Sequence, residues 1–246
     1  MFDFTSRLTL RSVAAYCAWR LRTKRDPIVL NLQSGPRFEL RENCSGNNDY
    51  GVAYEVFVMN YYDDHNLLDG KRVDLVVDLG VNVGFSLLYF LHKFEHCNII
   101  GFEPHPGHFV QAKRNLVLDD NAHRVQLYRQ AAGAKTRLMQ LSDSASSSSL
   151  IPMDLEQTVT VEVVDIFPLL QGKRIDLLKM DIEGGEYEIL GDPRFEKLEV
   201  DAIVMEWHSR GRDADDKHWC QHRLIELGFT IDEIFTEPGY GMFWAI

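Results

Sequence analysis

Residues 78–84, with the sequence DLGVNVG, place two glycines and two polar side chains at the end of an apolar segment. Gly80 permits a tight turn that other residues avoid, and Gly84 lets a following helix pack closely. A dinucleotide requires the spacing GxGxxG, because its pyrophosphate binds bare backbone amides, but this segment has DxGxNxG. Asp78 and Asn82 instead suit a ligand that carries an ammonium group and a carboxylate.

A carboxylate, Glu103, ends the next apolar segment and lies 19 residues after Gly84. In nucleotide-binding α/β folds, an acid about 20 residues beyond the glycine segment accepts hydrogen bonds from ribose hydroxyls. We therefore expect Glu103 to bind a ribose, and Asp78, Gly80, Asn82 and Gly84 to surround the rest of the same cofactor.

Four more titratable side chains follow two later apolar segments. Asp181 and Glu183 come after the first segment, and Glu206 and His208 come at the end of the second. If these segments are neighbouring parallel strands, the four side chains meet at the carboxyl edge of the sheet. We expect them to lie on the same side of the sheet as Gly80.

These side chains permit two arrangements for activating a hydroxyl group. In one, His208 is the general base and Asp181 orients the acceptor or the cofactor. In the other, Asp181, Glu206 and His208 bind a divalent ion such as Mg²⁺, which lowers the pKa of the hydroxyl. A structural alternative assigns Glu183 and Glu186 to the positive end of the next helix.

One lysine, Lys179, directly precedes this acidic segment. We expect its side chain to point away from Asp181 and to pair with Asp176 or with an acid on a helix. The sequence therefore indicates no chemical role for Lys179.

The segments DLGVNVG (78–84) and GFEP (101–104) resemble the cofactor motifs of class I S-adenosylmethionine-dependent methyltransferases. The segments LLKMDIEGGE (177–186) and MEWH (205–208) are similar to the K-(I/M)-D-(V/I)-E-G-x-E and E-x-H signatures of the FkbM family of methyltransferases. The K-x-D-x-E-G-x-E block is the most specific part of this match. Val81 stands where the family often has alanine, and it is small enough to keep the turn.

The resemblance covers roughly residues 50–210. It implies S-adenosylmethionine as the cofactor and O-methylation of a hydroxyl on a sugar or natural product, so a small-molecule or carbohydrate acceptor is the expected partner. Some sugar O-methyltransferases of related fold use a divalent ion, so the resemblance is compatible with Mg²⁺. Two alternatives stay open. One is a nicotinamide-dependent oxidoreductase, against which the missing third glycine counts, and the other is a non-catalytic subunit of the same fold.

An alternation of strands and helices must position these side chains, and from residue 73 onward it predicts a doubly wound, Rossmann-like α/β sheet. The resemblance implies seven strands, mostly parallel, with an antiparallel last strand. The expected strands are 73–79, 98–102, 125–128, 175–180, 202–206, 230–235 and 241–246, with an inserted hairpin at 137–141 and 159–164. The expected helices are 84–94, 105–118, 185–190 and 217–227. The last two strands should form a hairpin at one side of the sheet.

Residues 1–49 are expected to form an extension that caps the substrate site of a domain spanning 50–246. The extension contains a helix within 1–25 and a hairpin of two strands, at 28–32 and 37–40. The aromatic segment 50–62 is an expected helix, whose rings either close over the cofactor or pack in the core.

The net charge of −11 over 246 residues is unevenly distributed. Residues 1–25 hold six basic residues against one acid, about +5, which leaves about −16 for the rest. An acidic body repels a phosphate backbone, which argues against nucleic acid as a partner. The basic segment is expected either to pack on the domain or to contact anionic lipid or another protein.

The four cysteines are far apart and form no CxxC pair, which predicts free thiols and a cytoplasmic location. The longest segment without Asp, Glu, Lys or Arg is 79–92, which is too short to span a membrane.

Overall fold

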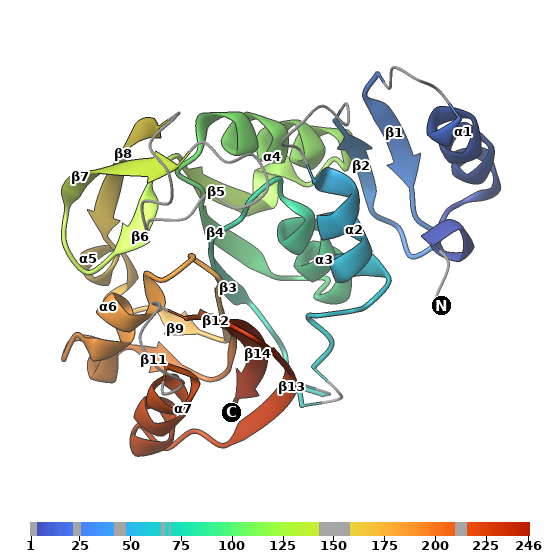
Figure 1. The fold of residues 1–246 in the computed structure, drawn as a ribbon. Coiled ribbons are helices and arrows are strands. Elements are labelled where there is room, and N and C mark those ends of the chain that lie inside the picture. The colour runs from blue at the N-terminus through green and yellow to red at the C-terminus, as the bar shows by residue number, and fades with distance from the viewer. Residues whose placement is uncertain are drawn as a thin grey trace.

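Seven strands form the central sheet, in the order β13-β14-β12-β10-β3-β4-β5 (Figure 1). The computed structural model describes residues 4–21, 26–41, 48–64, 67–68, 70–142, 158–209 and 216–246. The strands of this sheet are β3 (Leu75–Leu79), β4 (Asn98–Phe102), β5 (Val125–Tyr128), β10 (Leu177–Met180), β12 (Ile203–His208), β13 (Ile231–Glu237) and β14 (Tyr240–Ala245).

Strands β3, β4, β5, β10 and β12 pair in parallel, whereas β14 runs antiparallel to both of its neighbours, β12 and β13. The expected mostly parallel α/β sheet with a reversed last strand is therefore confirmed. The expected final hairpin at one side of the sheet is confirmed, with β13 at the edge and β14 between β13 and β12. The burial pattern explains this order: β14 is almost entirely buried, and the more polar β13 takes the edge.

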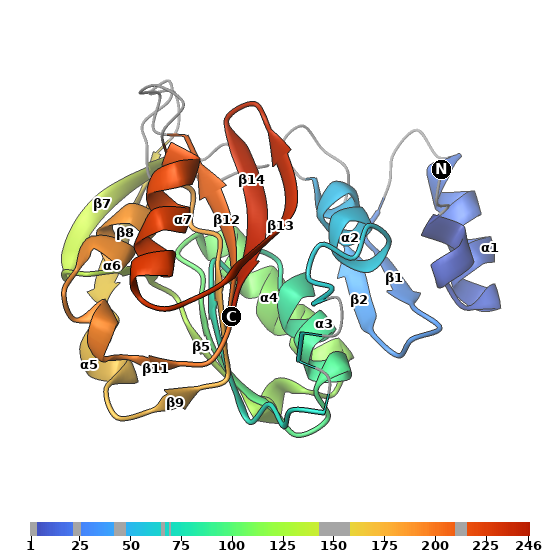
Figure 2. The ribbon, with the colours of Figure 1, turned by 90° about the horizontal axis from the view of Figure 1, so that it is seen from below.

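Helices cover both faces of the sheet (Figures 1 and 2). Side chains alternate along each strand, so Val76 and Leu177 pack toward the first face, while Val77 and Leu178 pack toward the second. The first face carries α2 (Asp49–Phe57), α3 (Phe85–Lys93) and α4 (Pro106–Leu118), and the second carries α5 (Phe167–Leu170), α6 (Glu186–Gly191) and α7 (Asp216–Glu226). Short 3-10 helices span Phe4–Arg7, Ala122–Arg124 and Phe195–Lys197.

Besides the central sheet, the described residues form three smaller sheets, one of them the amino-terminal hairpin. The inserted hairpin is confirmed as β7 (Arg137–Ser142) and β8 (Thr158–Asp165), and β6 (Ala131–Gly133) adds a parallel strand to it. Strand β9 (Arg174–Ile175) pairs with β11 (Glu199–Val200). The expected single strand 175–180 is thus broken at Asp176, whose carboxylate accepts hydrogen bonds from the amides of Asp74 and Leu75.

The amino-terminal extension consists of α1 (Leu10–Arg20) and an antiparallel hairpin of β1 (Ile28–Asn31) and β2 (Arg37–Leu40). Both the helix and the hairpin agree with the expected elements. The hairpin shares the core of the domain, because the Phe38 ring stacks on Phe57 and meets the edge of Phe85. No helix within the described ranges combines the length and apolar character that crossing a bilayer requires.

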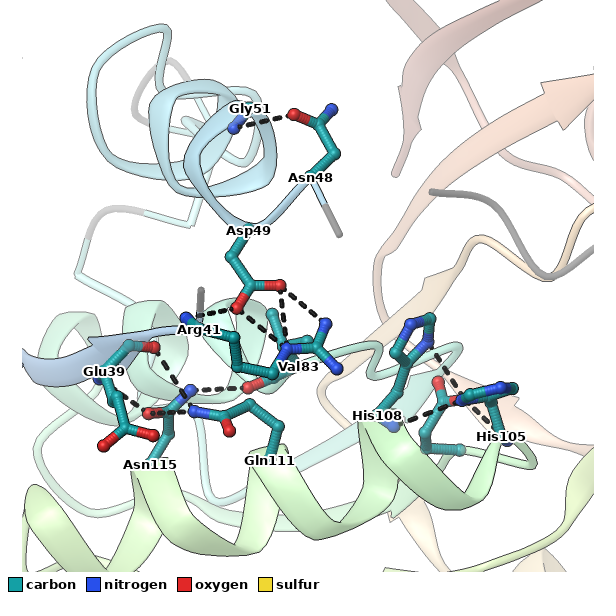
Figure 3. Close-up of polar contacts among 11 residues, drawn as sticks. Glu39, Arg41, Asn48, Asp49, Gly51, Val83, His105, His108, Gln111 and Asn115 are labelled. Carbon is teal, nitrogen blue, oxygen red and sulfur yellow. Dashed lines mark hydrogen bonds and ion pairs between the residues drawn. The ribbon is translucent and has the colours of Figure 1, made fainter. Parts of the chain in front are cut away.

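Polar contacts hold the hairpin against α4 and α2 (Figure 3). The side chain of Asn115 accepts a hydrogen bond from the Glu39 amide and donates one to the Val83 carbonyl. Arg41 donates to both carboxylate oxygens of Asp49, at the start of α2. Asn115 therefore joins the extension, α4 and the glycine segment after β3.

Candidate active site

The glycine bend after β3 requires both of its glycines. Gly80 and Gly84 each have a φ of 89°, a left-handed conformation that favours glycine. A Cβ on Gly80 would lie 1.8 Å from the carbonyl oxygen of Asp181, and a Cβ on Gly84 would lie 3.1 Å from the Cα of Ala112. Asn82, between them, also has a positive φ of 53°, which asparagine tolerates better than most residues. The bend therefore touches the segment that follows β10.

Glu103 follows β4 and is buried against this bend. Its two carboxylate oxygens accept hydrogen bonds from the backbone amides of Asn82, at 2.7 Å, and His105, at 2.8 Å. Burial raises the pKa of Glu103 to about 7, although the two amides oppose that shift. His105 and His108 lie beside it at the start of α4 (Figure 3). Glu103 thus ties the glycine bend to the end of the neighbouring strand.

Lys179 is the charged centre of the site, with only 2% of its surface exposed. Its Nζ lies 3.3 Å from Asp78 Oδ1 and 3.5 Å from Asp181 Oδ2, and it donates a hydrogen bond to the Gly80 carbonyl. The ammonium group also lies 5.9 Å from the centre of the Tyr62 ring, within cation–π range. Burial alone would lower the pKa of Lys179, but the neighbouring Asp78 raises it, so the side chain is charged.

The expectation that Lys179 points away from Asp181 is wrong. Residues two apart in an extended segment share a side, so Lys179 and Asp181 face the same way. Lys179 also faces Asp78, its partner in the register between β10 and β3. Asp176 is not its ion-pair partner, because that carboxylate accepts the two backbone amides at the start of β3.

Four of the expected acceptor-side groups converge, because β10 and β12 are parallel neighbours. His208 Nε2 lies 3.4 Å from Glu206 Oε1 and 3.5 Å from Glu183 Oε2. His208 Nδ1 lies 3.4 Å from Glu186 Oε1. One donor atom from each of Asp181, Glu206 and His208 lies within 4.8 Å of the other two, a spacing that fits around a single metal ion.

A cavity of about 130 Å³ connects the glycine bend with these acids. This volume is below the roughly 300–1,000 Å³ of ligand pockets, so the cavity accommodates only part of a nucleoside cofactor. Its lining comes from α2 and the segment after it, from the glycine bend, and from the ends of β10 and β12, and includes Glu55, Tyr61, Tyr62, Gly80, Asn82, Lys179, Asp181, Glu183 and Glu206.

The model of the methyltransferase FkbM domain matches residues 78–240, more than half of the chain. The chain belongs to the FkbM methyltransferase family. The matched range begins at Asp78 and includes the glycine bend, Glu103 and the whole acidic cluster around His208.

Named relatives agree with this assignment. Methyltransferase sdnD of Sordaria araneosa is 27% identical over 198 residues, 65% of this chain and 75% of that protein. Methyltransferase 1 of Beauveria bassiana (strain ARSEF 2860) is 26% identical over 204 residues, 72% of each chain. The solved structure of the fibrillarin pre-rRNA processing protein of Methanococcus jannaschii is similar in fold, with a TM-score of 0.50 and 13% identity over 90% of this chain and 82% of that one.

This FkbM chain is therefore an S-adenosylmethionine-dependent methyltransferase. The family resemblance expected from the motifs is confirmed. Family membership favours methyl transfer over the alternatives of nicotinamide-dependent oxidation and of a non-catalytic subunit.

His208 carries a positive charge among the carboxylates of Glu183, Glu186 and Glu206. Burial alone would lower the pKa of His208, but hydrogen bonds to Glu186 and Glu206, together with the nearby acids, raise it to about 12. Burial and the charge of Asp181 raise the pKa of Glu206 to about 7. Burial also raises the pKa of Glu183. At neutral pH, His208 is therefore an imidazolium surrounded by carboxylates.

Glu186 is the first residue of α6, at the end to which the structural alternative assigns it, but the amides that it binds precede the helix. Glu186 is fully buried, and its carboxylate accepts hydrogen bonds from the amides of Ile182 and Gly184, which orders the loop into α6. Glu183 has a positive φ of 53° and reaches His208 instead of the helix. A glutamate seldom adopts this conformation, so the loop stores backbone strain at the site.

Glu55 is a site residue that the motif analysis missed. It lies on α2, lines the cavity, and has a pKa raised to about 7 by burial and by Asp181. Its local signal is an acid in the middle of an aromatic helix. Lys179, in contrast, is the lysine of the K-x-D-x-E-G-x-E block, a signal that the sequence did offer.

The aromatic segment divides between core and site. Helix α2 ends at Phe57, before the expected end at residue 62, and Asn60 then adopts a positive φ of 54°. Tyr61 and Tyr62 line the cavity, whereas Tyr50 stacks on Tyr16 of α1. Among the described residues, α2 and not the hairpin borders the cavity, and the serine-rich segment 144–149 lies outside the described residues.

Proposed function

We propose that this FkbM methyltransferase transfers the methyl group of S-adenosylmethionine to a hydroxyl group of a sugar or natural-product acceptor. The observation that carries the proposal is the single cavity that joins the glycine bend to Asp181 and Glu206. Methyl transfer from a sulfonium is an in-line displacement, so its rate depends on holding the donor carbon and the acceptor oxygen about 3 Å apart. One shared cavity is the geometry that this reaction needs.

The donor end has the groups that S-adenosylmethionine requires. Each carboxylate oxygen of Glu103 uses one lone pair on a backbone amide and keeps another for a ribose hydroxyl. Gly80 and Asn82 line the cavity and then face the methionine portion, while the buried Asp78 holds Lys179 behind the bend. The sulfonium then lies beside Asp181, whose carboxylate stabilises its positive charge.

At the acceptor end, we assign the proton acceptor to Glu206. An imidazolium has no free lone pair, so His208 cannot accept a proton while it keeps its own. Glu206 has a pKa of about 7, which suits a general base at neutral pH. His208 then holds the Glu206 carboxylate in place, and Asp181 orients the acceptor hydroxyl.

A divalent ion at Asp181, Glu206 and His208 is the alternative arrangement. The spacing of the three donor atoms fits an ion, which when bound would lower the pKa of the acceptor hydroxyl. His208 would first have to lose its proton, because a metal ligand must be neutral imidazole. Asp181 already has Lys179 as its cationic partner and Glu206 already has His208, so we favour a reaction without the ion.

Lys179 positions the two halves of the site relative to each other. It contacts Asp78 and the Gly80 carbonyl on the donor side, and Asp181 on the acceptor side. Because this ammonium is buried and charged, moving either half would leave a charge without its partner. Lys179 therefore fixes the position of the glycine bend relative to the Asp181 carboxylate.

Matched acceptor pairs test the proposal. The enzyme is incubated with S-adenosylmethionine labelled in the methyl group and with sugars and natural products supplied as hydroxyl and amine analogues. We expect labelled methyl ethers from the hydroxyl compounds and no product from the Glu206→Gln variant. Methylated amines without methyl ethers would contradict O-methylation while leaving the methyltransferase assignment intact.

A further inference from the structure

Helix α1 has apolar side chains on two opposite faces. Its inner face is buried through Ser12, Tyr16 and Trp19. Leu10 and Leu21 point the other way and are 90% and 87% exposed. The outer face of α1, as we define it, consists of the exposed residues Leu10, Ala14, Cys17, Ala18 and Leu21.

This helix cannot turn its outer face inward. Tyr16 stacks on Tyr50 of α2, and the Trp19 indole donates a hydrogen bond to the Asp26 carbonyl. A surface helix normally presents polar residues to water, and a helix that is apolar all round is normally covered on every side. The outer face of α1 therefore exposes apolar side chains that a helix normally buries.

Positive charge borders the outer face on both sides. At about 100° per residue, Arg11 and Arg20 fall on opposite flanks of the line from Leu10 to Leu21. Both arginines are exposed, as is Arg7 just before the helix. The sequence has no acidic residue from 4 to 25, whereas the remainder of the chain is strongly acidic. A partner for this face is consequently anionic.

We propose that the outer face of α1 docks on an anionic membrane surface. Leu10 and Leu21 are eleven residues apart, about three turns, so they lie on one line about 16 Å long that a flat surface can contact along its whole length. Exposed leucines enter the boundary between headgroups and acyl chains, while flanking arginines meet the anionic headgroups. Apolar residues along one line of a helix, with arginines on both flanks, are typical of helices that lie on anionic membranes.

Vesicle flotation with the full chain tests this docking. Vesicles of phosphatidylcholine alone are compared with vesicles that contain about 30% phosphatidylserine, at about 0.1 M and about 0.5 M salt. We expect binding only with phosphatidylserine, and a loss of most binding at the higher salt. The paired changes Leu10→Gln with Leu21→Gln, and Arg11→Gln with Arg20→Gln, should each weaken binding about tenfold or more.

Matched controls come from elsewhere on the surface. Val110 and Val117 of α4 are 64% and 69% exposed, so Val110→Gln with Val117→Gln removes apolar surface away from α1. Lys173→Gln with Lys197→Gln removes two exposed charges. Both controls should bind as the wild type does, and all variants should keep their affinity for S-adenosylmethionine.

Three results would overturn the proposal. The first is no preference for phosphatidylserine over phosphatidylcholine, which would leave the outer face of α1 for an acidic protein. The second is normal binding by the leucine variant. The third is an equal loss of binding in the control variants.

Discussion

The donor and acceptor ends of the cavity are built by different means. The donor end depends on backbone: two glycines with positive φ shape the bend, and amides of the bend and of His105 hold Glu103. The acceptor end depends on charged side chains from β10 and β12, which face Glu55 of α2 across the cavity. The methyl donor is the same molecule in every reaction cycle, so a rigid backbone can bind it. Proton transfer instead requires titratable side chains whose pKa values the surroundings adjust.

The sharpest way to separate the two ends is to remove the proposed base. We expect Glu206→Gln to lower kcat about 10²–10⁴-fold, because general base catalysis contributes that much, and to leave the affinity for S-adenosylmethionine nearly unchanged. Steady-state kinetics and calorimetry measure the two quantities. A variant with normal kcat would show that Glu206 is not the base.

Lys179 joins the two ends, so its loss should affect both. Lys179→Met leaves Asp78 buried beside no cation, and we expect the free energy of unfolding to fall by about 3–5 kcal/mol. Cofactor affinity and kcat should fall as well. Thermal unfolding, calorimetry and kinetics check this, with the exposed Lys173→Met as the control.

A double substitution tests the coupling through Lys179 directly. Asp181→Asn should weaken cofactor binding in the wild-type background and have less effect in the Lys179→Met background. Additive effects of the two substitutions would mean that Lys179 does not link the ends.

The donor end alone is tested at Glu103. We expect Glu103→Ala to weaken binding of S-adenosylmethionine by about 1–3 kcal/mol, the cost of lost hydrogen bonds to a charged group. At saturating cofactor, kcat should stay close to that of the wild type, because the acceptor end is untouched. A large loss of kcat with unchanged affinity would reverse the assignment of the two ends.

The pH dependence should report the acceptor end. Glu206 must be ionised to accept a proton, and its pKa is about 7, so kcat at saturating cofactor should rise with pH and level off above about 7. Below that pKa the rate should fall about tenfold per pH unit. A pH profile that is flat between 5 and 8, taken as about the range where the enzyme stays folded, would contradict this assignment.

The smallest expected effect is that of a chelator. Because Asp181 and Glu206 each already have a cationic partner, Lys179 and His208, removal of divalent ions should change turnover less than about twofold. Activity lost to a chelator and restored by Mg²⁺ would instead favour the ion bound by Asp181, Glu206 and His208.

The contrast between the donor end and the acceptor end also explains which site residues the sequence could predict. The donor residues follow one another within two strand–helix units, so the spacing between Gly80 and Glu103 is enough to identify them. Strands β4 and β5 also have the predicted bounds, because both are short apolar runs between clear turns. Local pattern was sufficient wherever the interaction itself is local.

Contacts between distant segments were harder to foresee. Glu55 enters the site only because α2 packs over the sheet, and Lys179 meets Asp78 only through the register of β10 with β3. The insertion of β14 between β12 and β13 likewise follows from burial across the sheet. The roles of Asp181, Glu206 and His208 stay predictions, although the structure brings the three together.

The most direct measurement is a crystal structure with S-adenosylhomocysteine, the product of the donor. We expect the nucleoside to lie over the Gly80 bend, with both ribose hydroxyls on Glu103 and the sulfur facing Asp181 and Glu206. A bend without ligand, or a Glu103 carboxylate that contacts no ribose, would contradict the whole assignment of the donor end.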